Sequence, residues 1–187
     1  MADLEAEERR ESMNRTPISF DDLRLNSLQI WDKQWFLLTC GDFAAGDFNT
    51  MTVAWGSFGT MWHKPFAQIV VRPVRHTFTF LERFPTFTLS AFPRQHKKAL
   101  GVLGTRSGRD GDKIAETGLT PVACQHVASP CFAEAELVVE CRKIYWDDME
   151  PTRFLDPAVG SEYPEEDYHR IYFGEILAVE GDSRYAS

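Results

Sequence analysis

Two basic segments of the chain carry residue types that bind phosphate. The first, R-P-V-R-H-T at 72–77, stands where a buried strand ends and a helix begins. Two guanidinium groups, a hydroxyl and the free N–H groups of a helix N-terminus favour an anion. The second, S-G-R-D-G-D-K at 107–113, is a turn of small residues whose backbone N–H groups can form a nest, with Arg109 and Lys113 adding charge. Either segment alone also fits an ordinary loop.

A third segment, F-N-T-M-T-V-A-W at 48–55, could hold a planar ligand. Asn49 and Thr50 are turn formers directly before a strand, and the hydroxyls of Thr50 and Thr52 share one strand face. A ligand could lie along this edge and stack near Trp55. The other interpretation is a plain strand start with Trp55 in the core, and the spacing alone favours it.

The remaining reactive residues do not form a familiar catalytic set. The sequence has no G-x-S-x-G, H-E-x-x-H, Walker A or G-x-G-x-x-G pattern. Its five histidines and four cysteines lack metal-ligand spacing, so we expect no metal site, and Cys40 and Cys141 are expected to be buried hydrophobes. This pattern favours a protein whose reactive atoms belong to a cofactor.

Net charge and hydropathy limit the classes of partner that we expect for this chain. The net charge of -8 argues against nucleic acid or an anionic membrane surface as partner. Basic residues gather at 94–113, which suits a small anionic ligand, although charge alone favours a solvated surface. The N-terminus lacks an apolar signal region and no apolar run reaches about 20 residues, so we expect a cytoplasmic protein with reduced thiols.

The pattern of short apolar runs predicts a mainly β fold with short helical insertions. Six or seven strands and two or three helices indicate an antiparallel barrel. Residues 1–20 are expected to be a tail and 21–187 a single domain, with 149–167 either an arm onto a partner subunit or a lid. In the run at 133–144, alternation places Glu136 and Glu140 on the outer face. Strands are expected at 35–39, 51–55, 66–72, 86–92, 133–144 and 168–179, and helices at 77–84, 95–103 and 110–117.

Together these segments resemble the flavin reductase-like family of FMN-binding split barrels, and within it the flavoredoxin-type branch. The similar segments follow in order over nearly the whole chain after the N-terminal tail, which makes chance similarity a poor explanation. They are N-T-M-T-V-A-W at 49–55, H-K-P at 63–65, R-P-V-R-H-T at 72–77, F-T-L-S at 87–90, S-G-R-D-G-D-K at 107–113, G-L-T-P-V at 118–122, E-C-R-K-I-Y at 140–145 and D-Y-H-R-I-Y-F-G-E-I at 167–176.

The resemblance implies a Greek-key split β-barrel, a homodimer, and FMN held near the dimer interface. It implies that His169 lies near the exposed flavin edge and touches substrate, or else that it serves the dimer interface. Ile114 departs from the aromatic residue of many relatives, which affects helix packing more than ligand choice. The implied cofactor contacts are Asn49, Thr50, Met51, Thr52 and Trp55 at the ring and ribityl chain, Arg72, Arg75 and Thr77 near the ligand, Ser90 and Ala91 on a neighbouring strand, and Ser107, Arg109 and Lys113 at the phosphate or ribityl chain.

Three functions stay open from the sequence. The first is hydride transfer from NAD(P)H to the flavin, with electrons passed on to free flavin, iron or a protein. The second is a flavoredoxin-type electron carrier without nicotinamide turnover, and the third is a non-catalytic FMN-binding protein. The acidic composition favours a redox partner protein with a basic patch.

Overall fold

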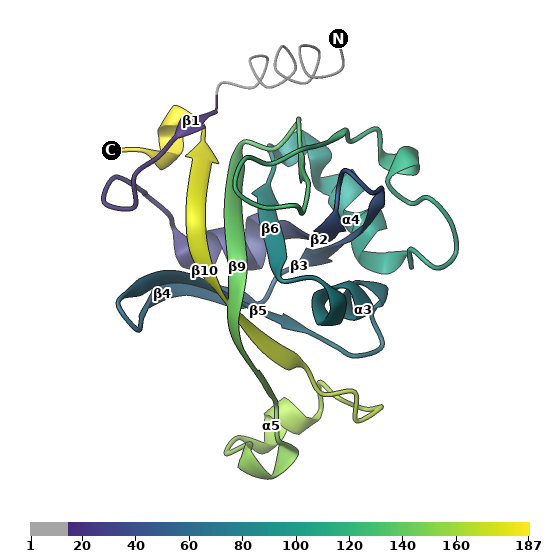
Figure 1. Cartoon of the computed structure of the whole chain (residues 1–187). Coiled ribbons are helices and arrows are strands. Elements are labelled where there is room, and N and C mark those ends of the chain that lie inside the picture. The colour runs from purple at the N-terminus through teal and green to yellow at the C-terminus, as the bar shows by residue number, and fades with distance from the viewer. Residues whose placement is uncertain (1–14) are drawn as a thin grey trace.

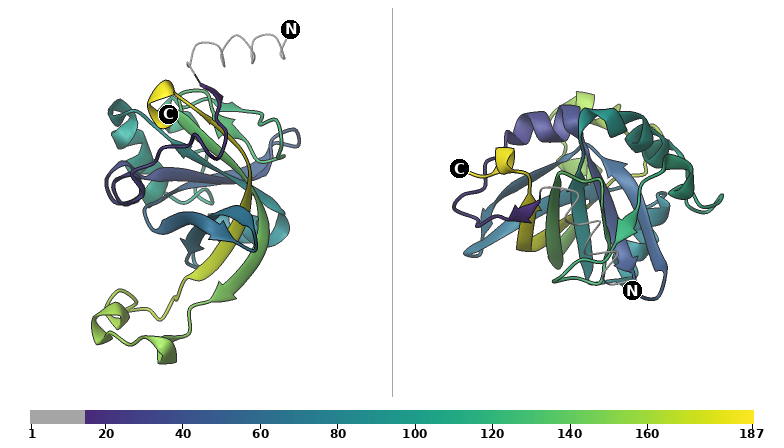
Figure 2. Two further views of the ribbon diagram at one scale, coloured as in Figure 1. Left: turned by 90° about the vertical axis from the view of Figure 1, so that its left-hand side faces the viewer. Right: turned by 90° about the horizontal axis from the view of Figure 1, so that it is seen from above.

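Eight strands form one antiparallel sheet in the computed structural model, which describes residues 15–187. Their order is β3-β2-β6-β9-β10-β5-β4, with the short β1 paired to β10. Figure 1 shows the sheet with α3 and α4 on one side, and Figure 2 shows how it curls into an incomplete barrel. The strands are β1 (Thr16–Pro17), β2 (Phe36–Asp42), β3 (Asp47–Val53), β4 (Gly56–Met61), β5 (Lys64–Val71), β6 (Thr86–Ala91), β9 (Leu137–Asp148) and β10 (Arg170–Gly181). A separate pair joins β7 (Pro121–Val122) to β8 (Cys131–Phe132).

The central strands are apolar on both faces because the sheet separates two cores. In β2, Leu38 and Cys40 point into the barrel core, whereas Leu37 packs in a second core beneath α4 (Lys97–Thr105). Cys141 of β9 also lies in the barrel core, so the predicted burial of both cysteines is confirmed. The mainly β, antiparallel fold predicted from the sequence is confirmed as well.

The barrel has a seam between β3 and β4. These strands follow one another in the chain through Ala54 and Trp55, yet they form the two ends of the described sheet and do not pair. β4 was not predicted, because its sequence G-S-F-G-T-M lacks a clear apolar alternation and the strand is largely exposed. The seam leaves room beside the ends of β3 and β5.

Two of the three predicted helices are present. α3 spans His76–Arg83, and the 3-10 turn Arg94–His96 leads into α4. The helix predicted at 110–117 is wrong: only a 3-10 turn, Ala115–Thr117, forms there. Gly111 has φ +143°, which a helix does not allow. Near the N-terminus, α2 (Ser27–Gln29) runs into a π-helical turn, Ile30–Gln34.

The outward positions predicted for Glu136 and Glu140 are wrong, since both side chains are buried. Glu140 accepts hydrogen bonds from the backbone N–H groups of Gln125 and His126, at 3.4 and 2.7 Å. Glu136 accepts one from Tyr185 Oη at 2.7 Å. Segments distant in sequence fold across this face and satisfy the carboxylates, which strand alternation alone cannot reveal.

The long strands β9 and β10 continue beyond the barrel and carry residues 149–169, which we call the arm. It contains the 3-10 turn Pro151–Arg153 and α5 (Pro157–Gly160). The arm projects from the end of the molecule opposite the C-terminus (Figures 1 and 2). No helix within residues 15–187 is long and apolar enough to cross a membrane.

Part of the segment predicted as a tail belongs to the fold. Residues 1–14 lie outside the described residues. Thr16 and Pro17 pair with Gly181 and Glu180 of β10, and Ile18 is buried in the barrel core.

Candidate functional site

Two adjoining cavities open beside the seam. The first has a volume of about 350 Å³ and lies between the end of β3, the end of β5 and the arm. The second, of about 100 Å³, lies between β3, the start of α3 and the loop after α4. Both are lined by Met51, Val74 and Arg75, so they adjoin one another. Their position at a sheet opening is typical of small-molecule sites.

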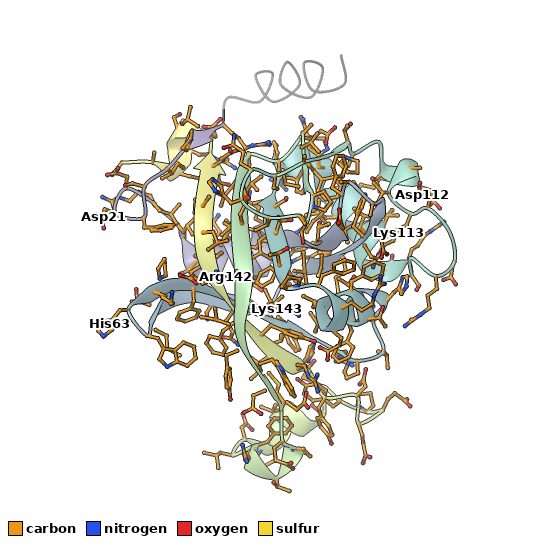
Figure 3. The ribbon with its side chains drawn as sticks, viewed as in Figure 1. Asp21, His63, Asp112, Lys113, Arg142 and Lys143 are labelled. Atoms are coloured by element: carbon orange, nitrogen blue, oxygen red, sulfur yellow. The ribbon has the colours of Figure 1, made fainter. Side chains whose placement is uncertain are left out.

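The second cavity gathers positive charge, and only Arg106 among its arginines and lysines has an acidic partner, Glu116, within residues 15–187. Lys113 is only 5% exposed, and its Nζ donates to the carbonyl oxygens of Leu103 and Arg106 at 3.2 Å each. Figure 3 shows Lys113 on the side of the molecule that carries α4. Within residues 15–187, no carboxylate forms an ion pair with Lys113, Arg75 or Arg109.

Burial is the largest cause of the pKa shifts around the second cavity, and neighbouring positive charge is the next. Burial, and secondly the nearby Arg75, lower the pKa of Lys113 from 10.5 to about 8. Burial and then Arg72 lower the pKa of Arg75. Burial followed by Arg109 and Lys113 lowers the pKa of His76. Nearby positive charges disfavour the protonated forms of Lys113, Arg75 and His76. An anion bound here would raise these lowered pKa values.

Close packing around Gly108 shapes the same cavity. A Cβ atom at Gly108 would lie 2.3 Å from Asn49 Oδ1 and 3.0 Å from His76 Nδ1. Asn49 in turn donates from Nδ2 to Thr77 Oγ1 at 2.7 Å. His76 Nδ1 is buried without a hydrogen-bond partner, and no side chain caps the N-terminus of α3. An orphaned polar nitrogen, an uncapped helix end and three cations fit a phosphate group.

The first cavity has an aromatic wall at the seam. Trp55 is 48% exposed, so it does not belong to the core, contrary to the interpretation that its spacing favoured. Its ring centroid lies 5.2 Å from that of His169. Thr52, on the same stretch, donates from Oγ1 to the carbonyl oxygen of Leu100 at 2.5 Å, which joins β3 to α4.

His169 and the arm close the other side of the first cavity. The His169 side chain is 9% exposed, and its Nδ1 lies 2.8 Å from Tyr163 Oη. Burial, and then the positive charge of Arg72, lower the pKa of His169 from 6.5 to about 4, so the imidazole is neutral at pH 7. Arg72 binds the Asp167 carboxylate at 3.0 and 3.2 Å and the Glu162 carbonyl oxygen at 2.7 Å.

The structure brings most of the predicted site residues to these two cavities. Thr50 does not line them: it is fully buried, and its Oγ1 donates to the Leu38 carbonyl oxygen at 3.1 Å. Ser90 and Ala91 are fully buried in β6 and also do not line them. The predicted residues that do are Asn49, Met51, Thr52, Trp55, Arg72, Arg75, Thr77, Ser107, Arg109, Lys113 and His169.

Sequence reasoning missed several other wall residues. His76 lies inside the basic segment at 72–77, and Asp167 lies two residues before His169. Their closeness to predicted site residues could have marked both as candidates. Tyr163 lines neither cavity but contacts His169, and it had no such signal, because the irregular stretch 149–167 has no periodicity from which to place a side chain.

Solved structures of several flavin proteins share this fold. Flavoredoxin of Desulfovibrio vulgaris (Miyazaki F) is 23% identical, with a TM-score of 0.62 over 87% of this chain and 73% of that chain. An FMN-binding domain of a flavin reductases-like enzyme from Shewanella baltica is 16% identical, with a TM-score of 0.66 over 91% and 78%. The NADH:FAD oxidoreductase of Streptomyces globisporus is 18% identical, with a TM-score of 0.60 over 80% and 77%.

The sequence comparisons give a family but no individual relative. No curated protein sequence matches the chain significantly. The profile of the flavin reductase like domain matches residues 33–186, which include every wall residue of both cavities. The chain therefore belongs to the flavin reductase like domain family.

Proposed function

We propose that the chain binds FMN across the two cavities. The observation that carries this proposal is the set of cations in the second cavity, Arg75, Arg109 and Lys113, which have no acidic partner among the described residues. The phosphate would occupy the second cavity and the flavin ring the first. The FMN-binding domain from Shewanella baltica, which has the same fold, supports this choice of ligand.

The protein side of the mechanism follows from the walls of the cavities. Bound flavin supplies reversible uptake of a hydride or of single electrons. Lys113 and Arg109 would hold the phosphate, while Asn49, fixed by Thr77, would orient the ribityl chain. Trp55 and the arm would shield one side of the flavin ring from water. The neutral His169 would form a hydrogen bond with a substrate that lies on the flavin ring.

We propose further that the chain is an NAD(P)H-dependent reductase that passes electrons to free flavin, iron or a protein. The first cavity supports this assignment because it is larger than the second and is bounded by the half-exposed Trp55, which leaves a second planar ligand access to the ring. The Streptomyces globisporus NADH:FAD oxidoreductase has also been solved in complex with NAD and FAD fragments.

An electron carrier is the second candidate, and one surface favours it. Trp62, Tyr145 and Trp146 are exposed large aromatic residues, and the Trp62 and Tyr145 rings are in contact, with centroids 5.9 Å apart. Such patches mark protein interfaces. A second copy of the chain in a homodimer, or a redox partner, would bury this surface.

The first experiment is an absorbance spectrum of the purified protein, followed by anaerobic addition of NADH and then NADPH. Flavin bands that bleach rapidly with one nucleotide support the reductase and identify its donor. Bands that persist with both nucleotides but bleach with dithionite support the carrier. A colourless protein that takes up no added FMN refutes flavin binding.

A further inference from the structure

One aromatic side chain of the arm, Tyr163, packs behind the His169 wall of the first cavity. Tyr163 is only 5% exposed although most of its neighbours in the arm are exposed. Its ring is stacked on Phe154, with centroids 5.8 Å apart and an interplanar angle of 15°, and it lies 5.1 Å from the Tyr168 ring. The Arg72 guanidinium covers it at 5.0 Å. The Tyr163 side chain is therefore held on several sides.

Arg72 joins this aromatic cluster to the barrel. It stands directly after β5, and it binds the arm through the Asp167 carboxylate and the Glu162 carbonyl oxygen. One residue thus contacts the arm on both sides of Tyr163 along the chain. The position of the Tyr163 hydroxyl is fixed relative to the cavity wall rather than to the arm alone.

The Tyr163 hydroxyl contacts one ring nitrogen of His169. Oη lies 2.8 Å from His169 Nδ1 and 3.3 Å from Met149 Sδ. A hydroxyl has a single proton to donate, and a thioether is a weak acceptor compared with an imidazole nitrogen. If the hydroxyl donates to Nδ1, the better acceptor, the imidazole's own proton is on Nε2; if it donates to Met149 Sδ, it accepts from Nδ1–H instead.

The remaining nitrogen of His169 is available to a ligand. Within residues 15–187 no hydrogen bond reaches Nε2, although the residue lines the first cavity. Trp55 packs against the same ring at 5.2 Å and limits its rotation. With the hydroxyl donating to Nδ1, Nε2–H is a hydrogen-bond donor facing the first cavity, and a carbonyl or carboxamide oxygen is one acceptor that it can serve.

We infer that Tyr163 is a positioning residue, which holds His169 so that Nε2–H donates to the carbonyl or carboxamide oxygen of a substrate in the first cavity. This inference rests on the proposed function, because the substrate would lie against the bound flavin. It makes the arm part of the substrate site, in addition to any role at a subunit interface.

The test compares Tyr163→Phe with Tyr168→Phe. Tyr163→Phe removes only the hydroxyl, whereas Tyr168→Phe changes a neighbouring ring of the same cluster whose hydroxyl forms no hydrogen bond among the described residues. The first readout is ¹⁵N NMR of the histidine side chains at pH 7, with the His169 signals assigned by their loss in His169→Gln. The second is the apparent Kd for NADH in anaerobic reduction of the FMN-loaded protein.

We expect one Nε2–H tautomer of His169 in the wild type and in Tyr168→Phe, and a mixture of tautomers in Tyr163→Phe. The apparent Kd for NADH should rise about five- to tenfold in Tyr163→Phe only, as expected for one lost hydrogen bond. FMN affinity should stay within about twofold of the wild type in both variants, because Tyr163 does not line the phosphate cavity.

An unchanged His169 tautomer in Tyr163→Phe would overturn the inference, as would a changed tautomer with unchanged NADH binding. Failure of the proposed function gives a different result from failure of this inference. In that case the wild-type protein itself binds no FMN, or NADH does not reduce its bound flavin, before any variant is compared. In that case the NMR comparison still decides whether Tyr163 fixes His169.

Discussion

Arg75 and Lys113 face the same small cavity, and the positive charge of Arg75 helps to lower the pKa of Lys113 to about 8. Lys113 is buried and Arg75 partly buried, and buried charges are normally paired with an opposite charge, which a bound anion would supply here.

Replacing Lys113 should weaken FMN binding. Lys113→Ala removes a charge-assisted contact worth about 1.5–3 kcal/mol, which corresponds to a loss of affinity of about 10- to 150-fold. Flavin fluorescence quenching measures it. The matched control is Lys98→Ala, which removes an exposed lysine of the same basic segment that lines neither cavity. Equal affinity in the two variants would remove Lys113 from the site.

The affinity for FMN should fall as the pH rises through about 8. The folded-state pKa of Lys113 lies below its usual 10.5, so the cation that the phosphate needs is present below pH 8 and is lost above it. The folded protein without ligand shows the opposite trend: its stability should rise between pH 8 and 10.5, because a destabilising buried charge disappears. Kd values for FMN between pH 6.5 and 9.5 test the first trend.

Lys113→Arg is the control for that pH dependence. An arginine stays protonated over the whole range, so its FMN affinity should change much less with pH. A wild-type profile as flat as that of Lys113→Arg would contradict the assignment of Lys113 to the phosphate.

Gly108 should not tolerate a side chain. The Cβ atom of Gly108→Ala would overlap Asn49 Oδ1 and press on His76 Nδ1, so the loop has to move away from the cavity. We expect a loss of FMN affinity of about 5- to 150-fold, measured by titration, as for an overpacked site that costs about 1–3 kcal/mol. Gly101→Ala in α4 is the control, since nothing lies within 4 Å of its Cβ position. It should leave binding unchanged and raise the melting temperature slightly.

Arg72→Ala should release the arm from the barrel. The variant loses the Asp167 ion pair, the Glu162 hydrogen bond and the contact with Tyr163. Amide hydrogen exchange in residues 149–169 should then become at least tenfold faster, while exchange in β2 and β6 stays as in the wild type. Arg83→Ala removes an exposed ion pair with Asp47 and should leave exchange in the arm unchanged.

Local sequence patterns predicted the strands whose apolar residues face a core. The runs around Leu38 in β2 and Val70 in β5 are of this kind, because a buried strand is rich in apolar residues. β4 was missed since its edge position requires little apolar surface. Glu136 and Glu140 were misplaced because their partners come from distant parts of the chain.

The sequence also predicted part of the candidate site, namely the residues that residue type alone marks as ligand-binding. The basic segments at 72–77 and 107–113 were recognised by residue type, and the fold brings both to one cavity. Thr50 and Thr52 looked equivalent in sequence, but the register of β2 and β3 places Thr50 beside Thr39, where its hydroxyl is used internally. The contribution of Tyr163 depends on how the arm folds back on Arg72, and no local pattern encodes that contact.

The seam between β3 and β4 has a consequence for the life of the protein in the cell. The FMN proposed to fill this opening would bind only the folded chain, and it would therefore add its binding free energy to the stability of the barrel against unfolding. Newly made chains in flavin-starved cells would have an unsealed barrel and would be degraded sooner. The abundance of the protein would then follow the supply of riboflavin, without any change in its synthesis.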